Sequence, residues 1–118
     1  MVYFSFMMKP SVRFKGFTQL DLRVGKVVEA TDVDGSDKLY RLEVDLGREY
    51  GIKTIFAGVK PWYPKSDLVN RKFVFVANLE PKRMMGAESQ GMMLAVEGSD
   101  KPVLLPAPEA ADIGAFLR

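Results

Sequence analysis

The chain has 118 residues, of which 47% are hydrophobic and 27% are charged. This composition is typical of one globular domain with a single core. Cysteine and histidine are both absent, which excludes disulfides, Cys/His zinc sites and the usual catalytic nucleophiles that depend on a histidine base. The lack of cysteine fits a reducing compartment, so we expect a cytoplasmic protein without a cofactor.

The net charge is only +2, but the charges are unevenly distributed along the chain. Between residues 38 and 92 there are ten basic and six acidic side chains, whereas residues 17 to 37 carry two basic and five acidic ones. This offset would allow a basic face on a nearly neutral protein, and a solvated mixed surface is the alternative.

The first sixteen residues are expected to form an N-terminal arm. The run Val2 to Met8 is apolar, but Lys9 and Pro10 end it too early for a signal peptide or a membrane span. An extra strand or a partner-facing arm is therefore predicted, with a possible dimer contact. The next segment, Gly16 to Asp21, is predicted to be a short lead-in of one helical turn capped by Thr18.

The first two strands are separated by a turn. Leu22 to Ala30 is rich in β-branched residues, and Gly25 inside it indicates a bulge or a sharp bend. The acidic turn Thr31 to Asp37 invites comparison with a calcium loop. It lacks the full ligand spacing and a glutamate at the twelfth position, and a strand follows it instead of a helix. Leu39 to Leu46 alternates apolar and polar residues, which predicts a half-buried strand.

The middle of the chain predicts two more strands with a helix between them. Ile52 to Ala57 returns as the hairpin partner of the preceding strand. A brief helix is predicted to start at Ser66 or Asp67. Lys72 to Ala77 is apolar on both faces, so this strand is expected to be covered on both sides.

A loop with binding chemistry is predicted between Asn78 and Gly91. Proline and glycine punctuate it, and it combines amide, hydroxyl and ammonium groups with the thioethers of Met84 and Met85. Such a mixture suits an extended anionic ligand with flat faces, because donors meet phosphates while apolar groups pack on bases. An ordinary connection with a solvated basic tip is the alternative. Met92 to Val96 then forms a fifth strand, and Val103 to Leu105 a short additional one.

Five short strands, one bend glycine and a helix between the third and fourth strands predict an all-β, five-stranded antiparallel Greek-key barrel of the OB-fold type. The barrel would span residues 17–105, between the arm 1–16 and a C-terminal extension 106–118. A small β-sandwich is the structural alternative.

Four segments also resemble the tRNA-binding domain family: D-L-R-V-G-K-V-V-E-A from Asp21, D-K-L-Y-R-L-E-V-D-L-G from Asp37, A-G-V-K-P-W-Y from Ala57, and V-A-N-L-E-P-K-R-M-M-G-A-E-S-Q-G-M-M-L-A from Val76. That family includes free-standing dimeric tRNA-binding proteins, the C-terminal domain of some methionyl-tRNA synthetases, synthetase cofactors and CsaA export chaperones. One departure is the turn Val33 to Ser36, where members usually carry a His-Pro turn.

The resemblance implies a non-catalytic barrel that binds tRNA by shape and backbone and dimerises through its terminal additions. The family's RNA-facing region maps onto Asn78, Lys82, Ser89, Gln90 and Met92, and its first-strand motif onto Arg23. The charge pattern adds Lys38, Lys53 and Arg83 as candidate phosphate contacts. Solvated surface is the alternative for each basic residue, and Ser89 and Asn78 could instead satisfy loop backbone groups.

Two functions of different class follow. The first is a homodimeric tRNA-binding module that assists an aminoacyl-tRNA synthetase in trans, with tRNA and the synthetase as partners and no membrane. The second is a CsaA-like chaperone that binds unfolded polypeptides through methionine-rich surface. The sequence favours the first, because the K-R-M-M-G-A-E-S-Q-G-M form of the loop resembles the tRNA-binding branches more closely.

Overall fold

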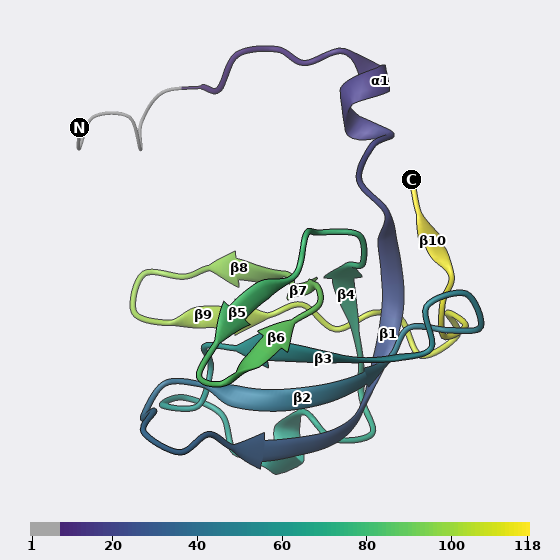
Figure 1. The fold of residues 1–118 in the computed structure, drawn as a ribbon. Coiled ribbons are helices and arrows are strands. Elements are labelled where there is room, and N and C mark those ends of the chain that lie inside the picture. The colour runs from purple at the N-terminus through teal and green to yellow at the C-terminus, as the bar shows by residue number, and fades with distance from the viewer. Residues whose placement is uncertain (1–7) are drawn as a thin grey trace.

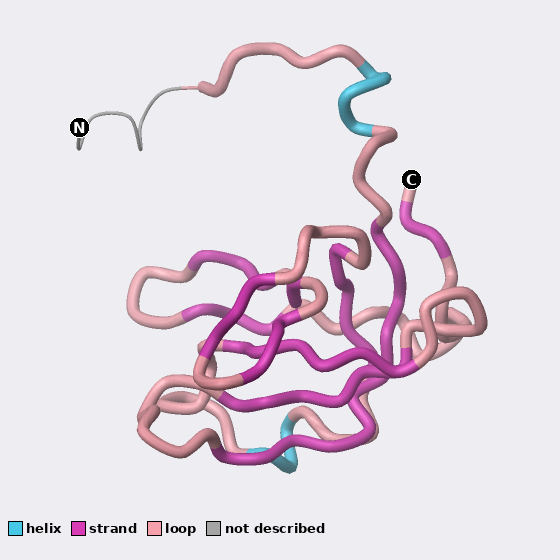
Figure 2. The backbone as a smooth tube through the Cα atoms, in the orientation of Figure 1, coloured by secondary structure: helices cyan, strands magenta, loops and turns pink. Residues whose placement is uncertain are grey.

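A computed structural model describes residues 8–118 of the chain. The predicted arm Val2 to Met8 therefore lies outside the described residues, except for Met8. The described part is almost entirely strand and loop (Figures 1 and 2). Its elements are α1 (Phe14–Phe17), β1 (Leu22–Asp32), β2 (Tyr40–Asp45), β3 (Ile52–Ala57), the 3-10 helix η2 (Lys65–Asp67), β4 (Lys72–Val76), β5 (Lys82–Met84), β6 (Ala87–Ser89), β7 (Met92–Met93), β8 (Ala95–Glu97), β9 (Pro102–Leu104) and β10 (Phe116–Leu117).

The main sheet is antiparallel and has the order β3-β2-β1-β4-β7, with β10 also paired to β1. Strand β1 holds it together, because its first half pairs with β4 and β10 and its second half pairs with β2. The register between β1 and β2 shifts from Val27 to Glu29, which is the irregularity expected where a strand changes partners. Strands β3 and β7 approach each other and nearly close the sheet into a barrel. The predicted all-β antiparallel barrel of OB-like type is confirmed.

The barrel core follows the alternation of the sequence. On β2 the side chains of Tyr40, Leu42 and Val44 are buried, whereas Arg41 is exposed. Every residue of β4 from Phe73 to Val76 is buried, as predicted for a strand covered on both sides. The largest fully buried side chains come from several strands and from the residues directly after β2 and η2: Phe73, Phe75, Leu42, Ile55, Leu46 and Leu68. Burying these apolar side chains supplies the main driving force for closing the barrel.

Three local predictions are corrected by the structure. The helical turn lies earlier than expected, at Phe14–Phe17, and Thr18 follows its C-terminal end, where its hydroxyl donates to Lys15 O at 2.7 Å. The helix between β3 and β4 is a single 3-10 turn at Lys65–Asp67 rather than a helix starting at Ser66 or Asp67 and running to Asn70. The predicted fifth strand is split at Leu94 into β7, which pairs with β4, and β8, which pairs with β9.

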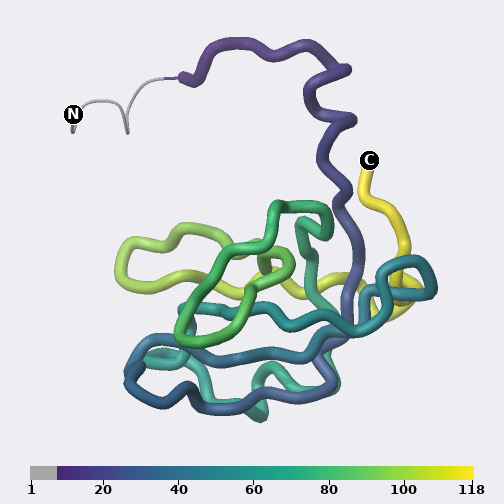
Figure 3. Tube along the Cα trace, viewed as in Figure 1, coloured from purple at the N-terminus to yellow at the C-terminus, as the bar shows by residue number. Residues whose placement is uncertain are grey.

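The segment before β1 and the C-terminal strand β10 lie at the same end of the barrel (Figure 1). Figure 3 shows the segment before β1 standing away from the barrel, and the C-terminal segment returning beside the start of β1. This return is a pairing of β10 with β1, in which Leu22 lies opposite Leu117 and Arg23 opposite Phe116. The C-terminal segment is thus part of the sheet, a role that its proline- and alanine-rich sequence did not predict.

Gly25 is needed where β1 crosses the core, and its replacement by alanine is expected to destabilise the fold. A Cβ atom there would lie 2.7 Å from a ring carbon of Phe75 and 2.8 Å from a methyl of Leu46, both fully buried. We expect Gly25→Ala to lower the free energy of unfolding by about 1–3 kcal/mol, the usual cost of overpacking. Urea denaturation would measure it, with Gly16→Ala as the control, because a Cβ at Gly16 meets nothing within 4 Å. Equal stability of the two variants would contradict the predicted crowding.

Candidate nucleic-acid interface

The predicted loop after β4 is a β-hairpin made of β5 and β6. Lys82 pairs with Ser89, Arg83 with Glu88 and Met84 with Ala87. The two linking residues, Met85 and Gly86, have φ of 46° and 84°, as in the type I′ turns that suit two-residue hairpins. Lys82 and Arg83 are exposed on β5, and neither forms a salt bridge within residues 8–118. The hairpin therefore presents two free cationic groups to solvent.

Ser89 and Gln90 fix this hairpin to β3. The Ser89 hydroxyl accepts a hydrogen bond from the Phe56 N–H at 3.1 Å and donates to Gly91 O at 3.3 Å. The Gln90 N–H donates to Thr54 O at 2.8 Å, and the Gln90 side-chain oxygen accepts from the Thr54 N–H at 3.2 Å. Both residues thus satisfy backbone groups, which is the alternative that the sequence left open for Ser89.

A hollow of about 490 Å³ lies beside the hairpin. Phe56 and Ser89, both buried, belong to its lining. Leu79, Met84 and Met92 provide further apolar surface, and the lining is completed by Glu80, Lys82 and Gly91. Leu79 and Met92 are 40% and 44% exposed, so apolar surface is open to solvent directly beside a lysine. This combination offers contacts to both an anionic group and a flat apolar group.

The structure brings together some of the predicted site residues and separates others. Lys82, Arg83, Ser89, Gln90 and Met92 lie on the hairpin and the strand that follows it, and Lys53 precedes Thr54 on β3. Lys38 lies in a different hollow with Ser36, Leu39 and Trp62. Asn78 and Arg23 lie near the chain ends, where each is occupied by contacts within the protein.

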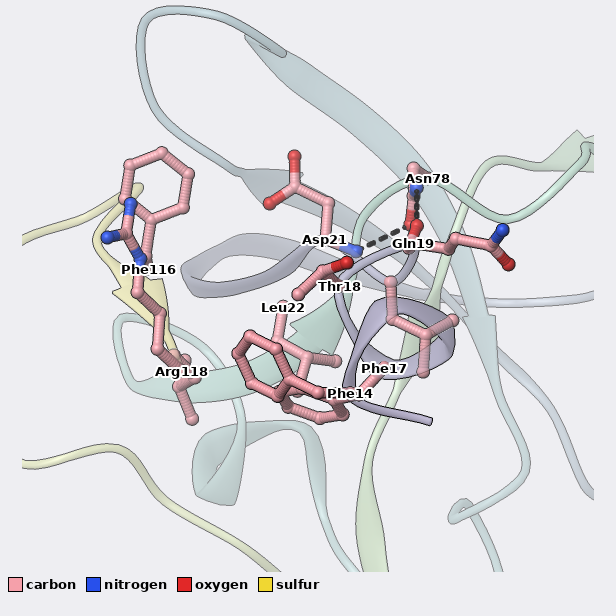
Figure 4. A pocket seen from close by; sticks show the side chains of 11 residues that line it. Phe14, Phe17, Thr18, Gln19, Asp21, Leu22, Asn78, Phe116 and Arg118 are labelled. Carbon is pink, nitrogen blue, oxygen red and sulfur yellow. Dashed lines mark hydrogen bonds between the residues drawn. The ribbon is translucent and has the colours of Figure 1, made fainter. Parts of the chain in front are cut away.

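Asn78 joins β4 to the segment before β1. Its side-chain oxygen accepts from the Asp21 N–H, and its side-chain nitrogen donates to Gln19 O, each at 2.8 Å (Figure 4). These two bonds hold the entry into β1 against the exit from β4. The geometry therefore matches the alternative interpretation of Asn78 as a residue that satisfies backbone groups.

Arg23 is buried, and its guanidinium group forms hydrogen bonds with several residues. Its guanidinium donates to both carboxylate oxygens of Asp21, at 2.7 and 3.1 Å, to Glu49 at 2.8 Å and to Gly114 O at 3.1 Å. It also lies over the Phe116 ring, 4.0 Å from the centroid. Because Gly114 and Phe116 belong to the C-terminal segment, this one side chain ties β1 to β10.

The same cluster shifts the proton affinity of its members. Hydrogen bonding from Arg23 lowers the pKa of Asp21, and burial opposes this only in part. The Tyr50 hydroxyl donates to Asp21 at 2.6 Å, and this bond raises the pKa of the tyrosine. The folded protein thus favours the ionised aspartate and the protonated tyrosine.

We expect the Asp21 cluster to make stability depend on pH in acid. Because the pKa of Asp21 is lower in the folded state, its stabilising effect is complete above the pKa of an unfolded aspartate, about 4, and is lost as pH falls through the folded value. Urea unfolding of the wild type and of Asp21→Asn between about pH 7 and 2 would measure this. The difference in stability between them should shrink as pH falls below about 4. A difference that stays constant with pH would contradict the assignment.

A second hollow, of about 580 Å³, lies between the chain ends. Figure 4 shows Phe14, Phe17, Leu22 and Phe116 around it, with Asn78 and Asp21 at its polar side. Phe14 is 78% exposed and Phe116 is 53% exposed. An apolar surface of this kind usually marks an interaction site.

Several lining residues were missed by sequence reasoning. Phe56 was assigned only to a hairpin strand, yet its ring lies on the side of β3 that carries Thr54, away from Ile55 in the core. The sequence did contain a signal for Phe56, because an apolar residue on the polar face of an alternating strand is expected to pack against another segment. Leu79 was read only as the exit from a strand.

Clustered metal ligands and helices that could span a membrane are both absent from the described part of the chain. No group of three or more acidic side chains within residues 8–118 could hold a metal ion. In the acidic turn the carboxylate of Asp32 instead binds Lys60 and Lys65, each at 3.3 Å. Within residues 8–118, no helix is long and apolar enough to cross a membrane.

Comparison with known proteins assigns the family. The family model described as "Putative tRNA binding domain" matches residues 22–115. The chain belongs to this tRNA-binding domain family. It is 47% identical over 107 residues to a methionine–tRNA ligase of Thermococcus onnurineus, in a match that covers 91% of this chain and 14% of the relative. The chain therefore spans only a small part of the curated relatives it matches.

Two solved structures share the fold over almost the whole chain. The MetRS related protein from Pyrococcus horikoshii has a TM-score of 0.86 and 36% identity, with 93% of this chain and 100% of that chain covered. The CsaA chaperone protein from Picrophilus torridus has a TM-score of 0.84 and 28% identity, with 92% and 100% covered. The resemblance seen in the sequence is thus confirmed, and a MetRS related protein and a chaperone protein share this fold.

Proposed function

We propose that this chain is a non-catalytic tRNA-binding protein that recognises the shape and backbone of tRNA as a homodimer. The observation that carries the proposal is the pair Lys82 and Arg83, which is exposed on a hairpin fixed to the barrel and makes no salt bridge to any residue from 8 to 118. Cations held on a rigid strand can meet phosphates without a large ordering cost. Membership of the tRNA-binding domain family supports tRNA as the anion.

The proposed site has a contact group and a positioning group. Lys82, Arg83 and Met92, with Lys53 on the neighbouring strand, would contact RNA. Ser89 and Gln90 would hold the hairpin in place through their bonds to β3. Asn78 and Arg23 would act further away by fixing the chain ends. Lys38 would be a peripheral phosphate contact in its own hollow.

The partner in trans is proposed to be an aminoacyl-tRNA synthetase in the cytoplasm. The relatives of this chain are named as methionine–tRNA ligases, and the matching segment is 14% of the length of such a relative. A barrel that supplies tRNA affinity can serve a synthetase as a separate subunit as well as a fused one. Binding of both tRNA and the enzyme would raise the effective concentration of the substrate at the active site.

The dimer is proposed to cover the hollow between the chain ends. The lining of this hollow comes from Phe14 in the proposed arm, from residues 17–22 and 78 of the proposed barrel, and from residues 116–118 of the proposed extension. Phe14, Leu20 and Phe116 leave much of their apolar area in solvent there. A second copy of the chain would bury this area and would place two RNA sites on one particle.

Phe14 is the residue through which the dimer is tested. We expect Phe14→Ser to weaken self-association about tenfold or more, because a fully buried phenylalanine contributes about 1.5–3 kcal/mol. Sedimentation equilibrium at micromolar concentration would measure it. Val12→Ser is the matched control, because Val12 is equally exposed but does not line the hollow. A wild type that sediments as a monomer, or a Phe14 variant that dimerises normally, would contradict this interface.

The function itself is tested by titration of the purified protein with bulk tRNA at about 50 and 200 mM salt. Competitors are a double-stranded DNA of equal length and an unfolded polypeptide. If about three to five phosphates are neutralised, the log-log slope of affinity against salt should be roughly −2 to −5. Binding that resists both competitors and weakens steeply with salt is the expected result.

A chaperone of the CsaA kind is the second candidate. The similar fold of the Picrophilus torridus protein and the exposed thioethers of Met85 and Met92 favour it. The same titration separates the two functions. Weak tRNA binding together with salt-insensitive capture of the unfolded polypeptide would replace the first proposal with this one.

A further inference from the structure

The hollow beside the hairpin has a chemistry that recognition of tRNA shape and backbone does not use. A phosphate backbone is bound by cations and hydrogen-bond donors. The hollow instead offers an apolar interior formed by Phe56, Leu79 and the thioethers of Met84 and Met92, with Lys82 beside it. Its volume of about 490 Å³ falls within the usual range of small-ligand pockets.

Few polar side chains line the hollow, and the one hydroxyl among them is committed to backbone partners. The Ser89 hydroxyl both accepts from Phe56 N–H and donates to Gly91 O. The Lys82 ammonium is exposed and has no carboxylate within salt-bridge distance in residues 8–118. Glu80 is the only acidic residue in the lining. The site can therefore hold an apolar face next to an anion, but it offers few groups that could read hydrogen-bonding edges.

The turn of the hairpin supports a binding role at this end. Met85 has a φ of 46°, a left-handed conformation that asparagine, aspartate or glycine usually provides in such turns. The side chain is 49% exposed, so no core burial offsets this backbone strain. Strain of this kind that persists at an exposed position often marks a functional surface. Met85 thus stands at the tip of the hairpin, next to the lining residue Met84.

We infer that this hollow takes one unpaired nucleobase of the bound RNA, with an adjacent phosphate at Lys82. This inference rests on the proposed tRNA binding. It adds that a single-stranded part of the RNA must reach the hollow. A base in a duplex has its faces stacked, whereas a base in a loop or at a chain end can turn out and pack on protein side chains. The chemistry of the hollow predicts that any base can bind. Purines should bind more tightly than pyrimidines, because their faces are larger.

The test compares RNA ligands that differ only in strandedness. A labelled oligo-adenylate of about six nucleotides, an oligo-uridylate of equal length, a blunt RNA duplex and bulk tRNA would be titrated against the full chain by anisotropy. The variants are Met92→Ala and Leu79→Ala, which shorten partly exposed side chains in the lining. Ile52→Ala is the matched control, because it removes a more exposed apolar side chain from β3 outside the hollow.

The expected result is selective. Oligo-adenylate should bind more tightly than oligo-uridylate, and Met92→Ala should weaken it about five- to a hundredfold, the range for loss of one base-packing contact. Met92→Ala should change the affinity for the duplex by less than about twofold. Ile52→Ala should change the affinity for oligo-adenylate by less than about twofold, the scale of neutral surface substitutions. Oligonucleotides carrying 4-thiouridine should photocrosslink to residues 79–92 or to Phe56.

Other outcomes overturn the inference. Equal binding of single strand and duplex, or no effect of either lining variant, would show that the hollow holds no base. If Met92→Ala lost the ability to bind an unfolded polypeptide while its RNA binding did not change, the hollow would be a peptide-binding pocket. Tight tRNA binding with these negative results would leave the proposed function intact, whereas failure of the wild type to bind tRNA at all would remove the function as well.

Discussion

Replacing Lys82 and Arg83 together by alanine should weaken tRNA binding roughly a hundredfold, because each charged hydrogen bond to a phosphate is worth on the order of a factor of ten. The log-log slope against salt should become shallower by about 1.4–1.8, the contribution of two released counterions. Anisotropy titrations at several salt concentrations would measure both quantities. Both side chains are exposed on β5, so stability should change by less than about 0.5 kcal/mol each.

Two kinds of control make this result specific. Arg48→Ala removes an equally exposed cation at the turn between β2 and β3, at the end of the barrel away from the hairpin (Figure 1), and should leave affinity within about twofold. The exchange Lys82→Arg with Arg83→Lys keeps both charges and should keep the salt slope. If Arg48→Ala weakens tRNA binding as strongly as the hairpin variants, the interaction is a general effect of net charge and not a site on β5.

The barrel could be predicted because the apolar pattern of its strands matches their burial. Tyr40, Leu42 and Val44 face the core as the two-residue period requires, and β4 is apolar on both faces because it is covered on both. For the alternating strand and for the doubly covered one, residue type and local geometry agree, so local reasoning was sufficient. Gly25 was predicted to mark a bulge or bend, whereas the register of β1 shifts between Val27 and Glu29. The space beside Gly25 is filled by Phe75.

The predictions that failed concern either contacts between distant residues or local sequence that is unusual for the structure it adopts. The local sequence does not predict that Phe116 and Leu117 pair with β1, because two residues are too few to show the alternation of a strand. The hairpin was predicted as a loop, since Met85 is an unusual residue for a type I′ turn. Thr18 was placed at the start of a helix because its residue type is common there, whereas its hydroxyl in fact bonds back to Lys15 O.

The residues of the candidate site also divide into those that the local sequence predicts and those that only the folded chain reveals. Lys82 and Arg83 could be found as a basic pair in a loop, because exposed charge is visible in a sequence. The partners of Asn78, by contrast, are 57 and 59 residues away, so only the folded chain reveals that this amide holds the barrel together. A pairing between segments so far apart in the sequence is a property of the fold.

Replacing Arg23 by alanine should lower the free energy of unfolding by about 3 kcal/mol, the lower end of the range for breaking a buried ion pair. The guanidinium side chain is 6% exposed, and its loss leaves Asp21 with Tyr50 as its only described side-chain donor and removes the contact over Phe116. Glu49 adds little, because its side chain is 68% exposed and water screens it. Urea denaturation would measure the change. A loss below about 1 kcal/mol would show that the cluster does not stabilise the fold.

Companion variants separate charge from packing and stability from binding. Arg23→Lys should cost about 1–2 kcal/mol, since one ammonium cannot reproduce the planar fork on Asp21 and the contact over Phe116. Adding Asp21→Asn to Arg23→Ala should recover part of the loss if an uncompensated carboxylate is the main penalty. The salt slope of tRNA binding then decides the role of Arg23. A residue that only positions β10 leaves the slope unchanged in the folded variant, whereas a direct phosphate contact would make it shallower by about 0.7–0.9.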